Sequence, residues 1–525
     1  MASGGAGGPL GAGPASLRRP RGRGPQILTP PEEGAPPAPI PDAPASFSNP
    51  STAVAEAPAV PTPSAPTRYF SPWVTAVYAL FTAALVAFFY VSWGSPLANL
   101  EHGEESLERL VSREMDLRQS FEHAARWERR LYELTGSDPE SFDDAIARYD
   151  EFDEDQRSAR GDLDLVVLLG EAGLLERAAG IIEALDGTEG EGAQYARWLE
   201  AAYLDAPSSE EATTIAEEIR RELPADWFTD TLVRRVASRV DDQPLQTQAE
   251  AAIEVRARSM LTRVRALTAL GAAVLALSVV VALRLRTFRR DPRLADAPLP
   301  PPWRGADGVG LFFRAAFAYL LIPALVVLLL PRMPPVTAVM GLVGGLPTLW
   351  WARRYLHARG LTVRDTFGLR LRPGRVARLL GWGLVLLAVS MAGESLLYLG
   401  LSALGVSSHW ADGFLEEFLW GPPTAVIAGT LDGVVWAPIF EELAFRGLLF
   451  PTLRLRLPAW LAALLSAAIF AFAHGYGAQG FAAVTWSGMV WALGYQRTRS
   501  LLPGMLAHAG SNLLATGSFL VLLRF

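Results

Sequence analysis

The chain has 525 residues, 50% of them hydrophobic, and a formal net charge of −7 at neutral pH. It is too long for one ordinary domain and too apolar to be soluble throughout, which indicates a membrane protein with soluble parts. Because the sequence contains no cysteine, disulfides, thiolate metal sites and a cysteine nucleophile are excluded. Every basic residue is arginine, and with the abundant alanine, glycine and proline this bias indicates a GC-rich bacterial genome.

The charge is spread unevenly along the chain. Residues 101–256 contain 17 basic and 39 acidic residues, a local balance of 17 − 39 = −22, so the remainder is net positive. The basic residues do not form the stripe or the motif of a nucleic-acid-binding domain, and the sequence gives no support for a nucleic-acid partner.

The N-terminal region divides into a tail and a first membrane helix. Residues 1–69 are rich in Pro, Ala, Gly and Ser and lack hydrophobic periodicity, which predicts a disordered tail. Residues 70–95 include an uncharged apolar run that is long enough to cross a hydrocarbon core roughly 30 Å thick. A cleavable signal peptide is not expected, because the region before this run is far too long.

Residues 96–260 form the acidic segment, in which amphipathic stretches alternate with Gly, Pro and Asp breaks. The stretches at Leu165–Leu185 and Glu211–Leu223 show helical periodicity, so we expect α-hairpins. A tetratricopeptide-like stack is the nearest architecture, but no clean 34-residue period is visible, and a plain helical bundle remains an equal alternative.

The rest of the chain is dominated by further apolar runs. With the first helix they give nine candidate spans, at about 71–93, 264–283, 309–331, 335–351, 378–404, 423–450, 459–478, 480–496 and 501–523. The predicted fold is therefore all-α, a polytopic membrane helix bundle with an inserted soluble α-helical domain. We divide the membrane part into helices and loops at 261–358 and a C-terminal bundle at 359–525.

Arginine is concentrated in particular loops and so predicts the orientation of the bundle. These loops contain Arg284–Arg293, Arg353–Arg378, Arg454 with Arg456, and Arg497 with Arg499. By the positive-inside rule they should be cytoplasmic. We therefore predict a multi-pass plasma-membrane protein with a cytoplasmic N-terminus, and with residues 96–260 and the acidic loop near Glu416 outside the cytoplasm.

Three fragments place ionisable residues in apolar sequence near the C-terminus. They are Glu441-Glu442-x-x-x-Arg446, Phe470-x-x-x-His474 and His508-x-x-x-Asn512. Such groups are costly in hydrocarbon and are usually kept for function. Glu442 and Arg446 are four residues apart and can pair on one helix face. Glu441 points about 100° away, so its neighbour must come from another helix.

His474 and His508 are the candidates for that neighbour. Counted from the basic turn at Arg454–Pro458, Glu441 and His474 lie at similar depths, roughly 20–27 Å, on the two arms of a hairpin. His508 lies only about 10 Å deep if its helix starts at Leu501, so it could meet Glu441 only if that helix were shifted or tilted.

The residue types indicate hydrolysis. A buried carboxylate beside an imidazole can take a proton from water, and an imidazole and an amide on another helix can stabilise an oxyanion. The alternative is a zinc ion bound by His474, His508 and Glu441 with one position left for water. No HExxH helix supports zinc, and we predict no cofactor.

The three fragments, read as Ala437–Gly447, Phe470–His474 and Leu506–Asn512, resemble the motifs of the CPBP intramembrane proteases. This family includes CAAX prenyl endopeptidases and Abi-type bacteriocin-processing or immunity proteins, and the resemblance covers about residues 360–525. It implies an intramembrane endopeptidase in which Glu441 and His474 activate water. It also implies that His508 and Asn512 stabilise the oxyanion and that Glu442 and Arg446 support the site.

The expected partners are the lipid bilayer and a protein or peptide substrate, with a prenylated substrate as one option. The acidic segment is placed to meet other proteins, and we expect it to recruit substrate. Two alternatives stay open. One is a non-catalytic scaffold or bacteriocin-immunity-type protein in which the same polar residues only tie helices together. The other is a transporter, which should show repeat symmetry and broken helices.

Overall fold

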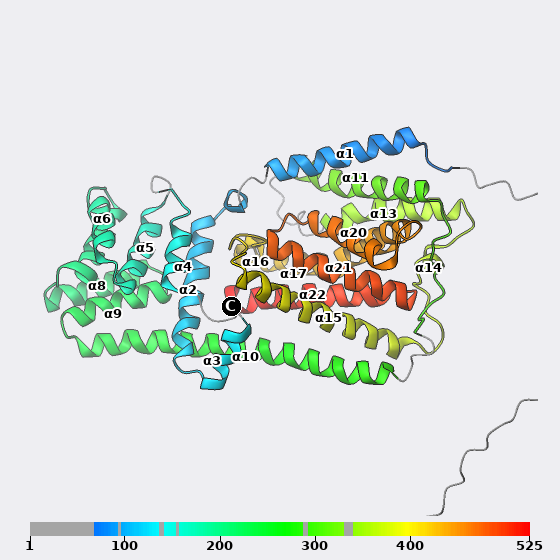
Figure 1. The fold of residues 1–525 in the computed structure, drawn as a ribbon. Helices are drawn as coiled ribbons and strands as arrows, with labels where there is room; N and C mark the ends of the chain where they lie inside the picture. The colour runs from blue at the N-terminus through cyan, green and yellow to red at the C-terminus, as the bar shows by residue number, and fades with distance from the viewer. Residues whose placement is uncertain (1–67, 93–95, 136–140, 154–156, 287–291, 330–339) are drawn as a thin grey trace, which may run out of the picture. The chain divides into compact units, whose positions relative to one another are not determined.

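The structure is a computed structural model, and it describes residues 68–92, 96–135, 141–153, 157–286, 292–329 and 340–525. All regular elements in these ranges are helical (Figure 1), which confirms the predicted all-α class. Nearly all of the predicted disordered tail lies outside the described residues.

The acidic segment folds into a set of short helices. They are η1 (Pro96–Asn99), α2 (Gly103–Phe121), α3 (Arg126–Thr135), α4 (Phe142–Tyr149), α5 (Ala159–Ala172), α6 (Leu175–Asp186), α7 (Glu191–Leu199), the π-helical turn η2 (Glu200–Leu204), α8 (Ser209–Glu222) and α9 (Trp227–Arg239). Ser141, Ser158, Ser208 and Asp226 each accept a backbone N–H at a helix N-terminus. Such side-chain caps stabilise the helix starts that follow Ser and Asp.

A charged cluster is buried beneath these caps. Arg160 contacts Glu108 at 2.8 Å and both Asp164 and Asp226 at 3.2 Å. Three carboxylates therefore share one guanidinium inside the domain. Burial, only partly offset by Arg160, raises the pKa of Glu108 to about 7.

A single long helix leads from the acidic domain into the membrane. This helix, α10 (Gln243–Arg286), packs against α2 and α9 with its first half and against α15 with its second. The helix therefore crosses the boundary predicted at residue 260 without a break. The apolar run of α10 is bounded on its N-terminal side by charged residues. These pair with carboxylates on neighbouring helices, Arg256 with Asp116 at 3.3 Å and Arg265 with Glu128 at 2.7 Å, so the helix continues without a break.

The membrane part is a bundle of longer helices. They are α1 (Pro72–Ser92), α11 (Gly305–Leu329), α13 (Met340–His357), the short α14 (Val363–Thr366), α15 (Val376–Ala403), α16 (Glu416–Trp420), α20 (Ala459–Phe472), α21 (Ala478–Thr498) and α22 (Leu502–Phe519), which ends in the π-helical turn η5 (Leu520–Arg524). A further helix runs from Pro423 to Leu453 through α17 (Pro423–Leu431), η3 (Asp432–Trp436), α18 (Ala437–Glu441), η4 (Glu442–Leu449) and α19 (Phe450–Leu453).

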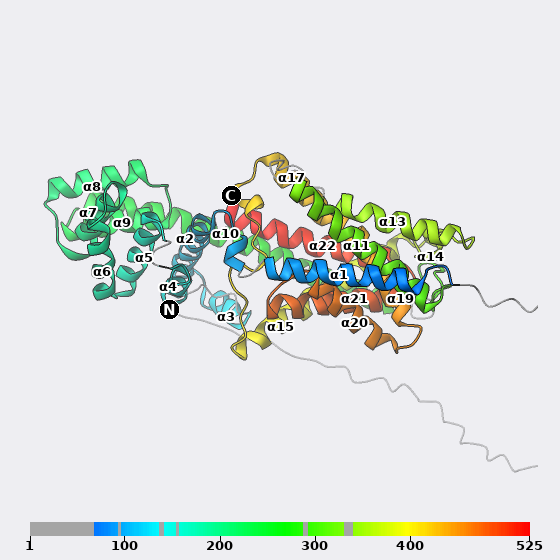
Figure 2. The ribbon, with the colours of Figure 1, turned by 90° about the horizontal axis from the view of Figure 1, so that it is seen from above.

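Six of the described helices are long and apolar enough to cross a membrane, and they coincide with six of the nine predicted spans. The other three apolar runs fall on α13, α20 and α21. Figure 2 shows the bundle from above. α22 packs against α15 and α21. α22 also packs against α18, so it brings its polar residues to the helix that carries the glutamates.

The acidic domain contacts one loop of the bundle. The Glu416 carboxylate accepts backbone N–H groups of Glu101 at 2.7 Å and His102 at 2.8 Å, and the hydroxyl of Ser106 at 3.0 Å. The carboxylate thereby accepts hydrogen bonds from N–H groups at the start of α2. Its negative charge also interacts favourably with the positive end of the helix dipole. His409, on the same loop, contacts Glu151 at 2.8 Å.

Candidate active site

The two adjacent glutamates lie where the long helix changes its winding. Glu441 ends α18, and Glu442 begins the π-helical segment η4, which also holds Arg446. π-helical turns are rare and often occur at functional sites. A second π-helical turn, η3, lies one element earlier in the same helix.

His508 provides the neighbour that Glu441 lacks in its own helix. Its Nε2 atom lies 3.6 Å from Oε2 of Glu441, and its Nδ1 atom lies 3.3 Å from Oε1 of Glu442. The ring is only 3% exposed and stacks on Trp491, with 4.3 Å between the ring centroids. One histidine therefore lies between two consecutive carboxylates, and its ring is stacked on an indole.

The position of His508 depends on a buried start of α22. Ser500 and Leu501, which precede the helix, are 0% and 1% exposed. The Ser500 hydroxyl donates to the Gly368 carbonyl at 2.6 Å, and the Leu501 N–H donates to the Phe367 carbonyl at 3.2 Å. A Cβ atom on Gly447 would lie 3.2 Å from the Leu501 side chain, so α22 begins beside Gly447 and not beside the turn at Arg454–Pro458, which brings His508 level with Glu441.

Glu442 and Arg446 form the predicted pair. The two side chains are 2.9 Å apart and both residues are 0% exposed. The Arg446 guanidinium also lies over the ring of Phe470, 4.2 Å from its centroid, and donates to the Gly488 carbonyl at 3.4 Å. A Cβ atom on Gly488 would collide with this guanidinium, so the glycine provides the space for a fully buried arginine.

His474 lies beside this group but is not joined to it. Its Nδ1 atom is 2.8 Å from the Phe470 carbonyl, and no hydrogen bond or ion pair with Glu441 is found in the described part of the chain. The Phe470 ring makes edge contacts with both imidazoles, at 4.6 Å to His474 and 5.8 Å to His508. Of the two candidates for contact with Glu441, the structure thus selects His508.

Asn512 lies one turn after His508 and binds backbone. Its side-chain N–H donates to the Gly433 carbonyl at 2.7 Å. In the π-helical winding of η3 the Ala437 N–H bonds to Asp432, so the next donor in sequence would be residue 438. That residue is Pro438, which has no N–H, and Asn512 satisfies the carbonyl left free. The amide keeps a second N–H for another acceptor.

One neighbour of Glu441, Tyr319, carried no usable sequence signal. The Tyr319 hydroxyl on α11 donates to Oε1 of Glu441 at 3.4 Å, although it stands alone in an apolar run. Glu394 on α15 accepts a hydrogen bond from Ser487. The sequence leaves Glu394 without a partner, and only the packing of α15 on α21 supplies one.

The zinc alternative would use His474, His508 and Glu441. Among the described residues, no three His, Asp or Glu side chains are arranged to hold a metal ion. Glu441 and His508 are close together, and His474 directs Nδ1 to the Phe470 carbonyl, which leaves its Nε2 atom available. No reaction step is derived through a metal.

Fold and site together define a class of protein, a multi-pass helical membrane protein with a polar, buried Glu-His site. Residues 423–514 match the family model described as type II CAAX prenyl endopeptidase Rce1-like. This match confirms the resemblance of the C-terminal membrane bundle to the CPBP/CAAX protease family. The match supports a membrane protease in general. No curated protein and no solved structure matches the chain.

Proposed function

We propose that the chain is an intramembrane endopeptidase that hydrolyses a peptide bond in or near the bilayer, with Glu441 and His474 activating water and with His508 and Asn512 stabilising the oxyanion. The observation that carries this proposal is the position of Glu441. Its side chain is 16% exposed and faces His508 within the segment that matches the protease family. Glu442 and Arg446 support the site, and no cofactor is needed.

Glu441 is the general base in this mechanism. Its Oε2 atom lies 3.6 Å from His508, slightly beyond hydrogen-bond length, and catalytic bonds of this kind are often long before substrate binds. Tyr319 and His508 approach different oxygens of this carboxylate and fix its direction. A water molecule at Glu441 would lose a proton to the carboxylate as its oxygen attacks the peptide carbonyl carbon.

His474 is suited to orient the same water. Because its Nδ1 donates to the Phe470 carbonyl at 2.8 Å, the neutral ring carries its lone pair on Nε2. That nitrogen can accept a hydrogen bond from water. The Phe470 ring, 4.6 Å away, keeps the imidazole in this orientation.

In the proposed mechanism His508 and Asn512 donate hydrogen bonds to the oxyanion. The donor of His508 is Nε2, because Glu441 lies 3.6 Å from it, beyond hydrogen-bond length, whereas Nδ1 contacts Glu442 at 3.3 Å. When the tetrahedral intermediate collapses, the C–N bond breaks and Glu441 returns its proton to the leaving amine. The products are a carboxylate and an amine, so one water is consumed for each bond.

A cleavage assay on the full chain in nanodiscs tests the proposal. The probes are a prenylated peptide with a C-terminal CAAX sequence and the same peptide without the lipid. We expect Glu441→Gln and His474→Ala to abolish cleavage, while the matched membrane variant Glu394→Gln leaves it within a few-fold of the starting protein. Cleavage at the full rate by both Glu441→Gln and His474→Ala would refute the mechanism.

The same variants separate the protease from a scaffold. In a scaffold that uses the polar residues only as links between helices, Glu441→Gln would keep the biological effect while the protein stays folded. Substrate trapping with Glu441→Gln would identify the bound protein and show whether a prenyl group is required.

A further inference from the structure

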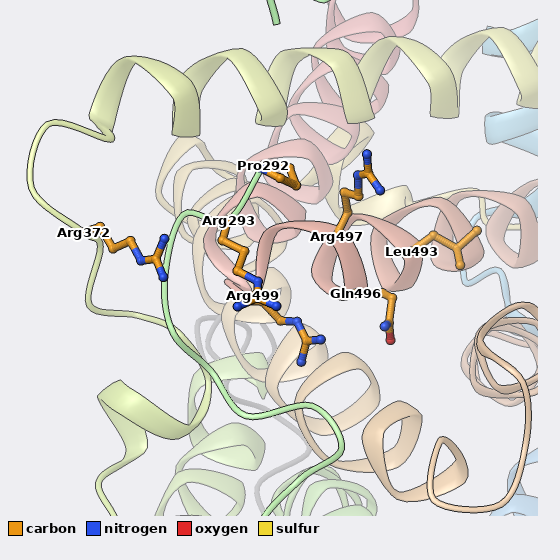
Figure 3. Close-up of a pocket in the computed structure, with 7 residues that line it drawn as sticks. All are labelled: Pro292, Arg293, Arg372, Leu493, Gln496, Arg497 and Arg499. Atoms are coloured by element: carbon orange, nitrogen blue, oxygen red, sulfur yellow. The ribbon is translucent and has the colours of Figure 1, made fainter. Parts of the chain in front are cut away.

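A basic cavity lies at one end of the bundle, away from the glutamates and histidines. It measures about 700 Å³. Its lining, shown in Figure 3, consists of Pro292, Arg293, Arg372, Leu493, Gln496, Arg497 and Arg499. Four of these seven described residues are arginine, so this part of the lining is cationic.

Three distant segments are tied together to form this cavity. The Leu294 N–H donates to the Thr498 carbonyl at 2.7 Å, and the Arg372 N–H donates to the Leu294 carbonyl at 2.9 Å. The Arg499 guanidinium also donates to the Leu299 carbonyl at 2.7 Å. These bonds are made by backbone groups of the arginines or of residues next to them. They therefore hold the positive charges close together despite their mutual repulsion.

Arg372 has a carboxylate partner beside the cavity. Arg372 makes a two-pronged contact with Asp296, whose side chain is 69% exposed. Burial and the nearby charges of Arg293 and Arg454 lower the pKa of Arg499. Clustered guanidinium groups of this kind match the geometry of a phosphate, which accepts paired N–H bonds from arginine.

The cavity also lies where helices of the membrane bundle end. Its residues follow α10, precede α15 and end α21. Leu493, one turn before Arg497 on α21, is 36% exposed and adds an apolar surface. This is also the side that the distribution of arginine predicts to be cytoplasmic, where anionic lipids attract basic pockets.

We propose that this cavity binds the phosphate-bearing headgroup of an anionic phospholipid, with Arg293, Arg372, Arg497 and Arg499 as its ligands and Leu493 against the acyl chain. The site contains none of the proposed catalytic residues. Its occupation would fix the turn between α21 and α22, and the second of these helices carries His508.

The test uses the full chain in nanodiscs of phosphatidylcholine, with and without phosphatidylglycerol, and native mass spectrometry to count retained lipid. We expect phosphatidylglycerol to be retained and phosphatidylcholine not to be. Arg497→Gln should weaken binding roughly fivefold, and Arg293→Gln with Arg497→Gln roughly 25-fold, since each basic residue near the surface contributes a similar amount.

The matched control is Arg364→Gln with Arg456→Gln, two exposed arginines on the same predicted side of the membrane that do not line the cavity. It should change lipid binding less than twofold. An equal loss in this control would mean that general attraction, and not the cavity, binds lipid, and equal retention of phosphatidylcholine would also overturn the proposal. Because Arg497 is exposed, Arg497→Gln should fold, and Arg293→Gln alone gives an independent variant.

A final arm distinguishes the lipid from soluble phosphate. Inorganic phosphate is titrated against the chain in phosphatidylcholine nanodiscs, and the melting temperature is recorded. We expect no shift at millimolar phosphate. A shift that disappears in Arg497→Gln would assign the site to a soluble phosphate compound and overturn the lipid assignment.

Discussion

Gly504→Ala tests whether the exact place of Glu442 matters for the reaction. Gly504 lies on the first turn of α22, four residues before His508. A Cβ atom there would stand 2.8 Å from Oε2 of Glu442, closer than real Cβ atoms approach other groups. The carboxylate cannot simply swing aside, because its other oxygen contacts Arg446 at 2.9 Å and His508 at 3.3 Å.

The magnitude follows from this geometry. The carboxylate must move by roughly half an ångström, and since a misplacement of about 1 Å in a catalytic group can cost about 100-fold in rate, we expect about a tenfold lower kcat. Alanine is favoured over glycine within a helix by about 1 kcal/mol, which offsets part of the strain, so the melting temperature should change little.

Cleavage kinetics and thermal unfolding in nanodiscs measure these two effects. Gly517→Ala on the same helix is the control, because a Cβ atom there meets nothing within 4 Å. It should keep the original kcat and gain some stability. If Gly504→Ala cleaved at the original rate while remaining folded, the inference that Glu442 positions His508 would be wrong.

Four further predictions concern the amide, the metal question and the acidic domain. Asn512→Ala should lower kcat by about 10²–10³ if it removes an oxyanion donor, whereas loss of only the Gly433 contact would reduce stability and leave the rate nearly unchanged. Chelation of zinc should leave cleavage intact, and metal analysis of the purified chain should show no stoichiometric zinc. In the acidic domain, the pKa of Glu108 is raised from 4.5 to about 7, so the folded form holds the proton longer than the unfolded chain. The associated stability is full below about pH 4.5 and is lost as the pH rises through 7, by about 3 kcal/mol in all, and denaturant unfolding of Glu108→Gln should lack this dependence. Deleting residues 97–260 with both flanking spans should leave cleavage of a generic peptide but abolish that of a recruited native substrate. Loss of folding would show instead that the deleted segment is structural, through the packing of α10 on α15 or the contacts of Glu416 with the start of α2.

The sequence alone determined the features that depend on local spacing. Apolar runs of sufficient length predicted the helices, because a chain in hydrocarbon must satisfy its backbone polar groups within itself. The four-residue spacing of Glu442 and Arg446 predicted their pairing, since neighbours on one helix face are fixed by helix geometry. The three motifs likewise indicated the protease family, which the match over residues 423–514 confirms.

Only the tertiary structure decided which residues meet across helices. It placed His508, and not His474, against Glu441, because the turn before α22 packs beside Gly447, close to the glutamates on their own helix. It joined Asn512 to Gly433, a bond that depends on the π-helical winding of η3 and on Pro438. It also gathered arginines from three loops into one cavity. Such contacts depend on how far one helix is displaced along another, and periodicity within a single helix does not contain that information.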